Sequence, residues 1–311
     1  MREEILFQVD TPYRHAQPVK GWYFGTPGEK SLAVMGALRG NEIQQMYICA
    51  RLIRALEKLE KDGLLAEDCG ILVVPCANQV SMNVGRRFWA ADNTDINRMF
   101  PGYDQGESTQ RIAARVFDAL QGYWYGVHLT SFYLAGDLLP HVRIMETGYQ
   151  QGEEALAFGL PYVVVRQPQP YDTTTLNYNW QIWETRAFSL YTTETECIDP
   201  DDARRAVQAV LRFLYARGLS LRDVPPSGAA PEVFQECGLH NVLSGAGGLL
   251  LRSREPGDVV KSGQILADIL DPCTGEVLEH LRSECTGRVF FARKSRLIDG
   301  HEVAFRILPE T

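Results

Sequence analysis

The sequence predicts an α/β domain with a mixed sheet flanked by helices, followed by a smaller all-β domain. Apolar runs without alternation at 31–38 and 71–75 are typical of strands that are buried on both faces of a sheet. Segments with helical periodicity alternate with such runs, which is the element order of an α/β fold. A proline-rich stretch at 225–231 then marks the expected boundary between domains 1–224 and 225–311.

The first domain is expected to contain three long helices, at about 42–62, 108–120 and 200–218. Capping residues support these limits, since Gly63 follows the first helix and Asp199 with Pro200 begins the third. Further strands are expected at 124–129, 162–166 and 188–194, and an aromatic loop is expected at 167–184. The second domain is expected to have strands at 248–251, 264–270, 288–291 and 302–307. Ligands of such α/β sheets bind at the carboxyl ends of strands, so polar residues there are the candidate site.

The composition excludes several classes of function. With 45% hydrophobic and 23% charged residues, the chain of 311 residues has the composition of a folded globular protein. Its 39 acidic and 31 basic residues give a net charge of −8, which disfavours nucleic acid and anionic lipid as partners. We find neither an apolar leader nor a run of about 18 apolar residues, so we expect no membrane association and a cytoplasmic location. The seven cysteines include no C-x-x-C pair, which indicates reduced thiols, and a homo-oligomer stays possible.

The first candidate motif, G-A-L-R-G-N-E at 36–42, joins a buried strand to a helix through a tight turn. Glu42 is either a functional carboxylate over the strand end or a charge that stabilises the helix N-terminus. In the second motif, within 78–102, Arg87, Asn97 and Arg98 suit recognition of a carboxylate, because a guanidinium matches two oxygens. The structural alternative for this motif is ion pairing between aspartates such as Asp95 and the arginines.

The third and fourth motifs also lie at expected strand ends. A single histidine such as His128 is most often structural, but imidazole and a nearby Glu42 carboxylate would supply two-thirds of a catalytic zinc site. Glu194, in the segment Y-T-T-E-T-E, could be a general base or a solvent-facing acid before the next helix.

Taken in this order, the four motifs resemble the succinylglutamate desuccinylase/aspartoacylase family of zinc carboxypeptidase-like hydrolases. The clearest match is D-I-N-R-M-F-P-G at 95–102, which resembles the family's D-x-N-R-x-F-P-G segment, and T-T-E at 192–194 matches its T-x-E segment. The second domain, with E-P-G-D-V-V-K-S-G-Q at 255–264, is similar to the biotinyl/lipoyl-like β domain often fused in this family. It has no lysine in a Met-Lys-Met-like turn, so we expect no attached cofactor there.

The resemblance implies a zinc-dependent amidohydrolase that cleaves the amide bond of an N-acyl amino acid or similar small carboxylate. It assigns six residues: Glu42 and His128 as metal ligands, Arg87 as the group that polarises the scissile carbonyl, Asn97 and Arg98 as ligands of the substrate carboxylate, and Glu194 as the general base.

Two positions depart from the family pattern. Arg39 stands where the family has its first histidine ligand, and a guanidinium has no lone pair to donate to a metal. Gly126 stands where the family has the aspartate that orients the later histidine. Three alternatives stay open: His141 or Asp137 completes the metal site, Arg39 makes this a catalytically silent, metal-free carboxylate-binding protein, or Arg39 points elsewhere.

Overall fold

A computed structural model describes residues 1–10, 16–225, 228 and 230–310. By its contacts the chain divides into two compact units, which are described separately. Unit 1 comprises 1–131 and 141–233, and unit 2 comprises 132–140 and 234–311. Residues 226, 227 and 229 of the expected linker lie outside the described residues.

Within the described residues, a nine-stranded mixed sheet forms the centre of unit 1. The strands, in their order across the sheet, are β1 (Arg2–Val9), β2 (Gln17–Gly25), β4 (Gly70–Cys76), β3 (Leu32–Ala37), β5 (Tyr125–Leu129), β9 (Arg186–Tyr191), β7 (His141–Met145), β8 (Tyr162–Arg166) and β10 (Glu232–Gln235). The central strands β4, β3, β5 and β9 are parallel, whereas β7 is antiparallel to β9. This sheet confirms the predicted α/β class.

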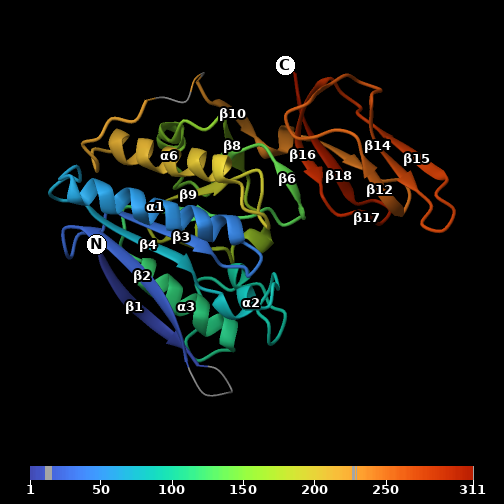
Figure 1. Ribbon diagram of the computed structural model, residues 1–311. Coiled ribbons are helices and arrows are strands. Elements are labelled where there is room, and N and C mark those ends of the chain that lie inside the picture. Colours follow the sequence, from blue (N-terminus) through green and yellow to red (C-terminus); the bar gives the residue numbers. More distant parts are fainter. Residues whose placement is uncertain (11–15, 226–227, 229, 311) are drawn as a thin grey trace. The chain divides into compact units, whose positions relative to one another are not determined.

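Helices cover both faces of the sheet (Figure 1). The long helices α1 (Ile43–Lys61) and α6 (Pro200–Ala216) pack against each other and bury their apolar residues on one face. On the other face, α3 (Ser108–Leu120) and α5 (Leu176–Ile182) join a second apolar cluster. The short helices are α2 (Gln79–Asn83), α4 (Gly152–Ala155), and the 3-10 turns η1 (Ile96–Arg98), η2 (Leu156–Phe158), η3 (Pro170–Asp172) and η4 (Glu236–Gly238).

The three long helices agree with the sequence prediction, and Asp199 caps α6 by accepting the amides of Asp201 and Asp202. The expected aromatic loop at 167–184 was wrong, because this segment contains η3 and α5. Thr175 caps α5 by accepting the amide of Tyr178, and Trp180 is fully buried beneath the helix. The strand expected at 188–194 ends earlier, at Tyr191, so Glu194 lies in the loop that follows.

Unit 2 is built from antiparallel strands around its own apolar core. Its strands are β6 (Gly136–Leu138), β11 (His240–Leu243), β12 (Gly248–Arg252), β13 (Val259–Val260), β14 (Ile265–Leu270), β15 (Val277–Arg282), β16 (Gly287–Arg293), β17 (Leu297–Ile298) and β18 (Val303–Pro309). They form two sheets, with orders β11-β18-β16-β13 and β15-β14-β12-β17. The strand β6 pairs with β16. Residues 132–140 therefore belong to unit 2, although they lie in sequence between the two segments of unit 1.

Candidate functional site

The candidate site lies where the parallel strands β3 and β5 end. The chain leaves β3 at Ala37, makes a turn and enters α1 with Glu42 as the residue before the helix. Gly40 is required in this turn, because a Cβ there would lie 2.3 Å from the Arg86 carbonyl oxygen. The Gly40 amide also donates to the Arg87 carbonyl at 2.9 Å. The turn is therefore fixed against the segment that carries Arg87.

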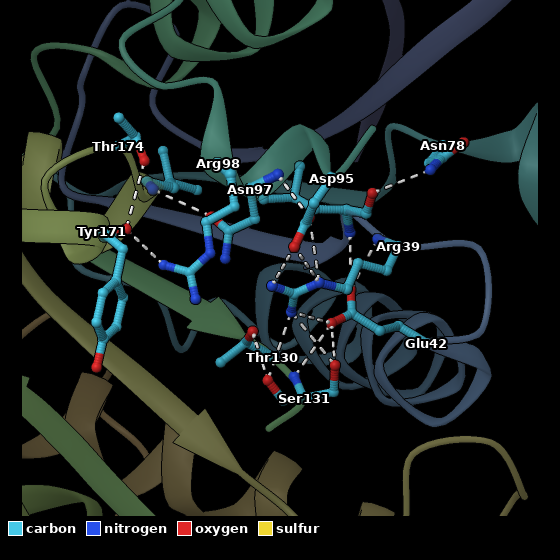
Figure 2. A network of polar contacts seen from close by, with 12 residues as sticks. Arg39, Glu42, Asn78, Asp95, Asn97, Arg98, Thr130, Ser131, Tyr171 and Thr174 are labelled. Atoms are coloured by element: carbon cyan, nitrogen blue, oxygen red, sulfur yellow. Dashed lines mark hydrogen bonds and ion pairs between the residues drawn. The ribbon is translucent and has the colours of Figure 1, made fainter. Parts of the chain in front are cut away.

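The carboxylate of Glu42 is completely buried and fully hydrogen-bonded (Figure 2). Its Oε2 accepts from the amides of Leu38 and Arg39, each at 3.0 Å. Its Oε1 accepts from the amide of Ser131 at 3.1 Å, from the Ser131 hydroxyl at 2.6 Å and from Arg39 Nη1 at 3.2 Å. Burial alone would raise the pKa of Glu42, but the Arg39 charge and these hydrogen bonds hold it below its usual value. Glu42 is therefore an anion at neutral pH whose acceptor positions are occupied.

The guanidinium of Arg39 bridges two carboxylates. It forms a forked contact with Asp95, from Nε to Oδ1 and Oδ2 at 3.2 and 3.1 Å and from Nη2 to Oδ2 at 2.9 Å. Its Nη1 faces Glu42, and it also lies 3.4 Å from the carbonyl oxygen and the hydroxyl of Ser131. Burial would lower the pKa of Arg39, but Glu42 and Asp95 raise it well above its usual value. The residue is only 3% exposed, so a permanent cation lies inside the site.

His128 belongs to the same cluster. It lies on β5, in register with Met35 on β3, and it is 1% exposed. Its Nε2 has no hydrogen-bond partner among the described residues. Burial lowers the pKa of His128 to about 4, although the nearby Glu42 charge opposes this shift and Arg39 adds to it. The imidazole is therefore neutral at physiological pH.

Arg87 also lies near this cluster. Its side chain is partly buried and its guanidinium lies 5.6 Å from the centre of the Phe88 ring. Burial lowers the pKa of Arg87, and the Arg39 charge lowers it further. Two guanidinium groups thus share one region, and their charge is balanced by Glu42 and Asp95.

The side chains of Asn97 and Arg98 hold the site loop to a second segment (Figure 2). Asn97 Oδ1 accepts the amide of Leu176 at 3.1 Å, at the start of α5. Arg98 Nη1 donates to the Tyr171 carbonyl at 2.7 Å and lies 3.6 Å from Asp172 Oδ1. Both side chains therefore hold the loop at 95–102 to the segment at 171–176. Their role in binding a carboxylate stays a prediction.

Glu194 lies beyond the end of β9 and is partly buried. Its carbonyl oxygen accepts from the Thr192 hydroxyl at 2.8 Å, and its role as a base stays a prediction.

Sequence reasoning missed Tyr191, the last residue of β9. Tyr191 lies near enough to Arg39 to raise the pKa of Arg39. Tyr191 directly precedes the T-T-E segment. Knowledge of the exact end of the strand would have identified it as a residue of the site, but apolar patterning does not fix where a strand ends.

The residues present do not fit a zinc ion. Catalytic zinc normally needs three protein ligands, and no group of three His, Cys, Asp or Glu side chains converges in the described part of the chain. The carboxylate oxygens of Glu42 already accept hydrogen bonds from five donors. Arg39 places a positive charge where the family has its first histidine ligand. His141 stacks on the Tyr191 ring, and Asp137 pairs with Arg252 at 2.8 Å within unit 2.

The glycine that stands in place of the histidine-orienting aspartate has a packing explanation. A Cβ at Gly126 would lie 2.7 Å from the Trp180 ring, so this ring occupies the space that a longer side chain would need. Any residue larger than glycine at this position would displace a completely buried tryptophan.

A sequence model of the succinylglutamate desuccinylase/aspartoacylase catalytic domain matches residues 28–217. The chain belongs to this family. The predicted resemblance is thereby confirmed, and the match covers all the site residues considered above.

Individual relatives agree with this family assignment. The chain is 32% identical over 123 residues to the N-alpha-acetyl-L-2,4-diaminobutyric acid deacetylase of Halomonas elongata, a match that covers 36% of this chain and 35% of that protein. A succinylglutamate desuccinylase from Silicibacter sp. TM1040 has the same fold, with a TM-score of 0.81 at 18% identity over 94% of this chain and 88% of the other. The product-bound ectoine utilization protein EutE (DoeB) from Ruegeria pomeroyi has a TM-score of 0.80 at 17% identity, over 94% and 89% of the two chains.

Among the described residues, no helix is both long enough and apolar enough to cross a bilayer.

Proposed function

We propose that this member of the desuccinylase/aspartoacylase family binds a small carboxylate of the N-acyl amino acid class and does so without a metal. The observation that carries the proposal is the Arg39 guanidinium, held at 3.2 Å from Glu42 and at 2.9 Å from Asp95. A buried cation with two carboxylate partners neutralises the group that the family uses as a metal ligand. The proposal corresponds to the silent, metal-free alternative in the sequence analysis.

The geometry also supports an anionic ligand at this edge of the sheet. Arg87 lies near Arg39 in a partly buried region, and a guanidinium can donate paired hydrogen bonds to a carboxylate. The matched relative deacetylates N-acetyl-2,4-diaminobutyrate by its name, which supports a ligand with one acyl group and one free carboxylate.

A second candidate is hydrolysis of such an acyl amino acid, the activity expected from the family. The neutral His128 imidazole favours it, because its Nε2 has no hydrogen-bond partner in the described part of the chain and a neutral imidazole nitrogen is a usual metal ligand. In that candidate Glu42 and His128 would hold the metal, which would supply an activated water. Arg87 would polarise the scissile carbonyl and Glu194 would act as the base. Arg39 would first have to leave Glu42.

One experiment separates the two candidates. Calorimetry with N-acetyl-L-2,4-diaminobutyrate and N-succinylglutamate, in the presence of a chelator, should detect binding of at least one compound. Release of free amine from the same compounds should stay at background after zinc is added, with the Halomonas deacetylase as the positive control. Chelator-sensitive amine release would instead support the hydrolase.

A further inference from the structure

Two buried nitrogen atoms on one face of the unit 1 sheet lack hydrogen-bond partners among the residues that the structure describes. His128 Nε2 and Arg143 Nε make no hydrogen bond within the described part of the chain. Buried donors and acceptors in native proteins nearly always have partners, so each such atom requires an explanation. The Arg39 network does not supply one, because it uses neither nitrogen.

The strand register places these two residues on the same face. His128 on β5 pairs with Ser189 on β9, and Ser189 pairs with Arg143 on β7. Residues directly opposite each other on neighbouring strands point to the same side of a sheet, and two strand spacings amount to about 10 Å. The small side chain of Ser189 lies between the two longer ones along this row of the sheet. The charge of Arg143 also helps to lower the pKa of His128, consistent with this proximity.

Helix α5 covers this face and adds a third polar group. Asn177 is 2% exposed, and neither its amide oxygen nor its amide nitrogen has a partner among the described residues. The Trp180 ring lies against Gly126 of β5, two residues before His128.

The direction of α5 places Asn177 toward His128. The chain passes from the end of α5 to Arg186, whose amide donates to the Trp124 carbonyl at 3.0 Å, just before β5 begins. The other end of the helix is held to Asn97 through the Leu176 amide. The helix therefore runs opposite to β5, and Asn177, one turn before Trp180, lies on the His128 side of Gly126.

Arg143 also differs from the other arginines of the site in what it contacts. Arg39 is paired with Glu42 and Asp95, and Arg98 is bound to Tyr171 and Asp172. The Arg143 guanidinium lies over the Tyr191 ring, 4.8 Å from its centre. Contact with a ring face leaves the in-plane N–H groups of a guanidinium able to donate.

We propose that Arg143, His128 and Asn177 form a buried subsite that binds the carboxylate group of the small ligand. The planar guanidinium suits two carboxylate oxygens, and the amide of Asn177 can donate a further hydrogen bond. This inference deepens the proposed function and rests on it, because it names the residues that receive the ligand's acid group.

The test is titration calorimetry of the full chain with acetate and with succinate as probes. Arg143→Met should weaken binding of the better probe roughly 10- to 100-fold, because a charge-assisted donor pair is lost. Asn177→Asp, which is isosteric but places a negative charge in the subsite, should weaken binding as well. The matched control is Arg186→Met, a cation on the same sheet that contacts Trp124 and Glu154 instead and should leave binding unchanged.

Unchanged binding of both probes by folded Arg143→Met and Asn177→Asp proteins would overturn the subsite, and so would the absence of any binding by the natural protein. Thermal melting identifies a variant that fails to fold, and the other variant then decides. The metal-free proposal has its own measurement, the zinc content. If zinc-dependent turnover were found, the proposed function would fail, whereas the subsite would still predict a raised KM with little change in kcat for Arg143→Met.

Discussion

Arg39 and Glu42 form an ion pair inside the protein, with 3.2 Å between Nη1 and Oε1, at a spacing of three residues. Arg54 and Glu57 on α1 have the same spacing and the same distance, but the Arg54 side chain is 78% exposed. The two pairs differ chiefly in burial. At the site, where the Arg39 and Glu42 side chains are 4% and 0% exposed, loss of Arg39 leaves the buried Glu42 carboxylate without its ion-pair partner.

Removal of the Arg39 side chain should destabilise the protein strongly. We expect Arg39→Ala to lower the free energy of unfolding by about 3–5 kcal/mol, the usual cost of breaking a buried pair. Urea denaturation followed by circular dichroism measures this change. Arg54→Ala is the matched control and should have little effect, because exposed pairs contribute little. Equal effects of the two variants would contradict the account.

Replacement of Arg39 by histidine should create a zinc site. Arg39→His removes the cation from Glu42 and adds an imidazole to the region that already holds Glu42 and His128, which together make the usual set of three ligands. Elemental analysis after zinc reconstitution should find more zinc in Arg39→His than in the natural protein. Arg39→Gln, which removes the charge without adding a ligand, is the control and should not gain zinc. A variant Arg39→His that stays free of zinc would argue against the convergence of Glu42 and His128.

Stability should depend on pH through His128. Its pKa in the folded protein is about 4, below the value of about 6.5 expected in the unfolded chain. Between these values the unfolded state binds more protons, so stability should fall as pH falls from 6.5 toward 4, by up to about 1.4 kcal/mol per pH unit. His128→Asn should flatten this part of the curve in urea denaturation series. His301→Asn, at an exposed histidine, should keep the slope of the natural protein.

Asn97 should be needed for stability whether or not it binds ligand. Asn97→Ala removes the acceptor of the buried Leu176 amide, and an unpartnered buried donor costs about 1–3 kcal/mol. Thermal or urea unfolding should detect a clear loss. The exposed Asn83, at the end of α2, offers the control Asn83→Ala, for which we expect little change. If Asn97→Ala had the same stability as the natural protein, the hydrogen bond between Asn97 and the start of α5 would not contribute to stability.

Much of the fold could be predicted because its signals are local. The apolar runs of β3 and β4, the glycine after α1 and the Asp199-Pro200 start of α6 each fix an element through neighbouring residues. The segment β6 could not be predicted in this way, since its partner β16 lies about 150 residues later in the sequence. Helix α5 was missed because its aromatic residues have weaker helix propensity than aliphatic ones.

The site was predictable only in part for a similar reason. The motifs placed Glu42 and His128 at strand ends, and the structure brings them within electrostatic reach of each other. The partners of Arg39 could not be deduced, because Asp95 and Ser131 lie 56 and 92 residues away in sequence. Arg143 carries no motif at all, and only the register of β7 with β9 reveals its position.

In the proposed function, Arg39 takes the place of a metal in this family member. Equilibrium dialysis of the natural protein against zinc at pH 7, followed by elemental analysis, tests it most directly. We expect a zinc content indistinguishable from that of a protein without a zinc site. About one tightly held zinc per chain, lost on Glu42→Gln or His128→Asn, would contradict it.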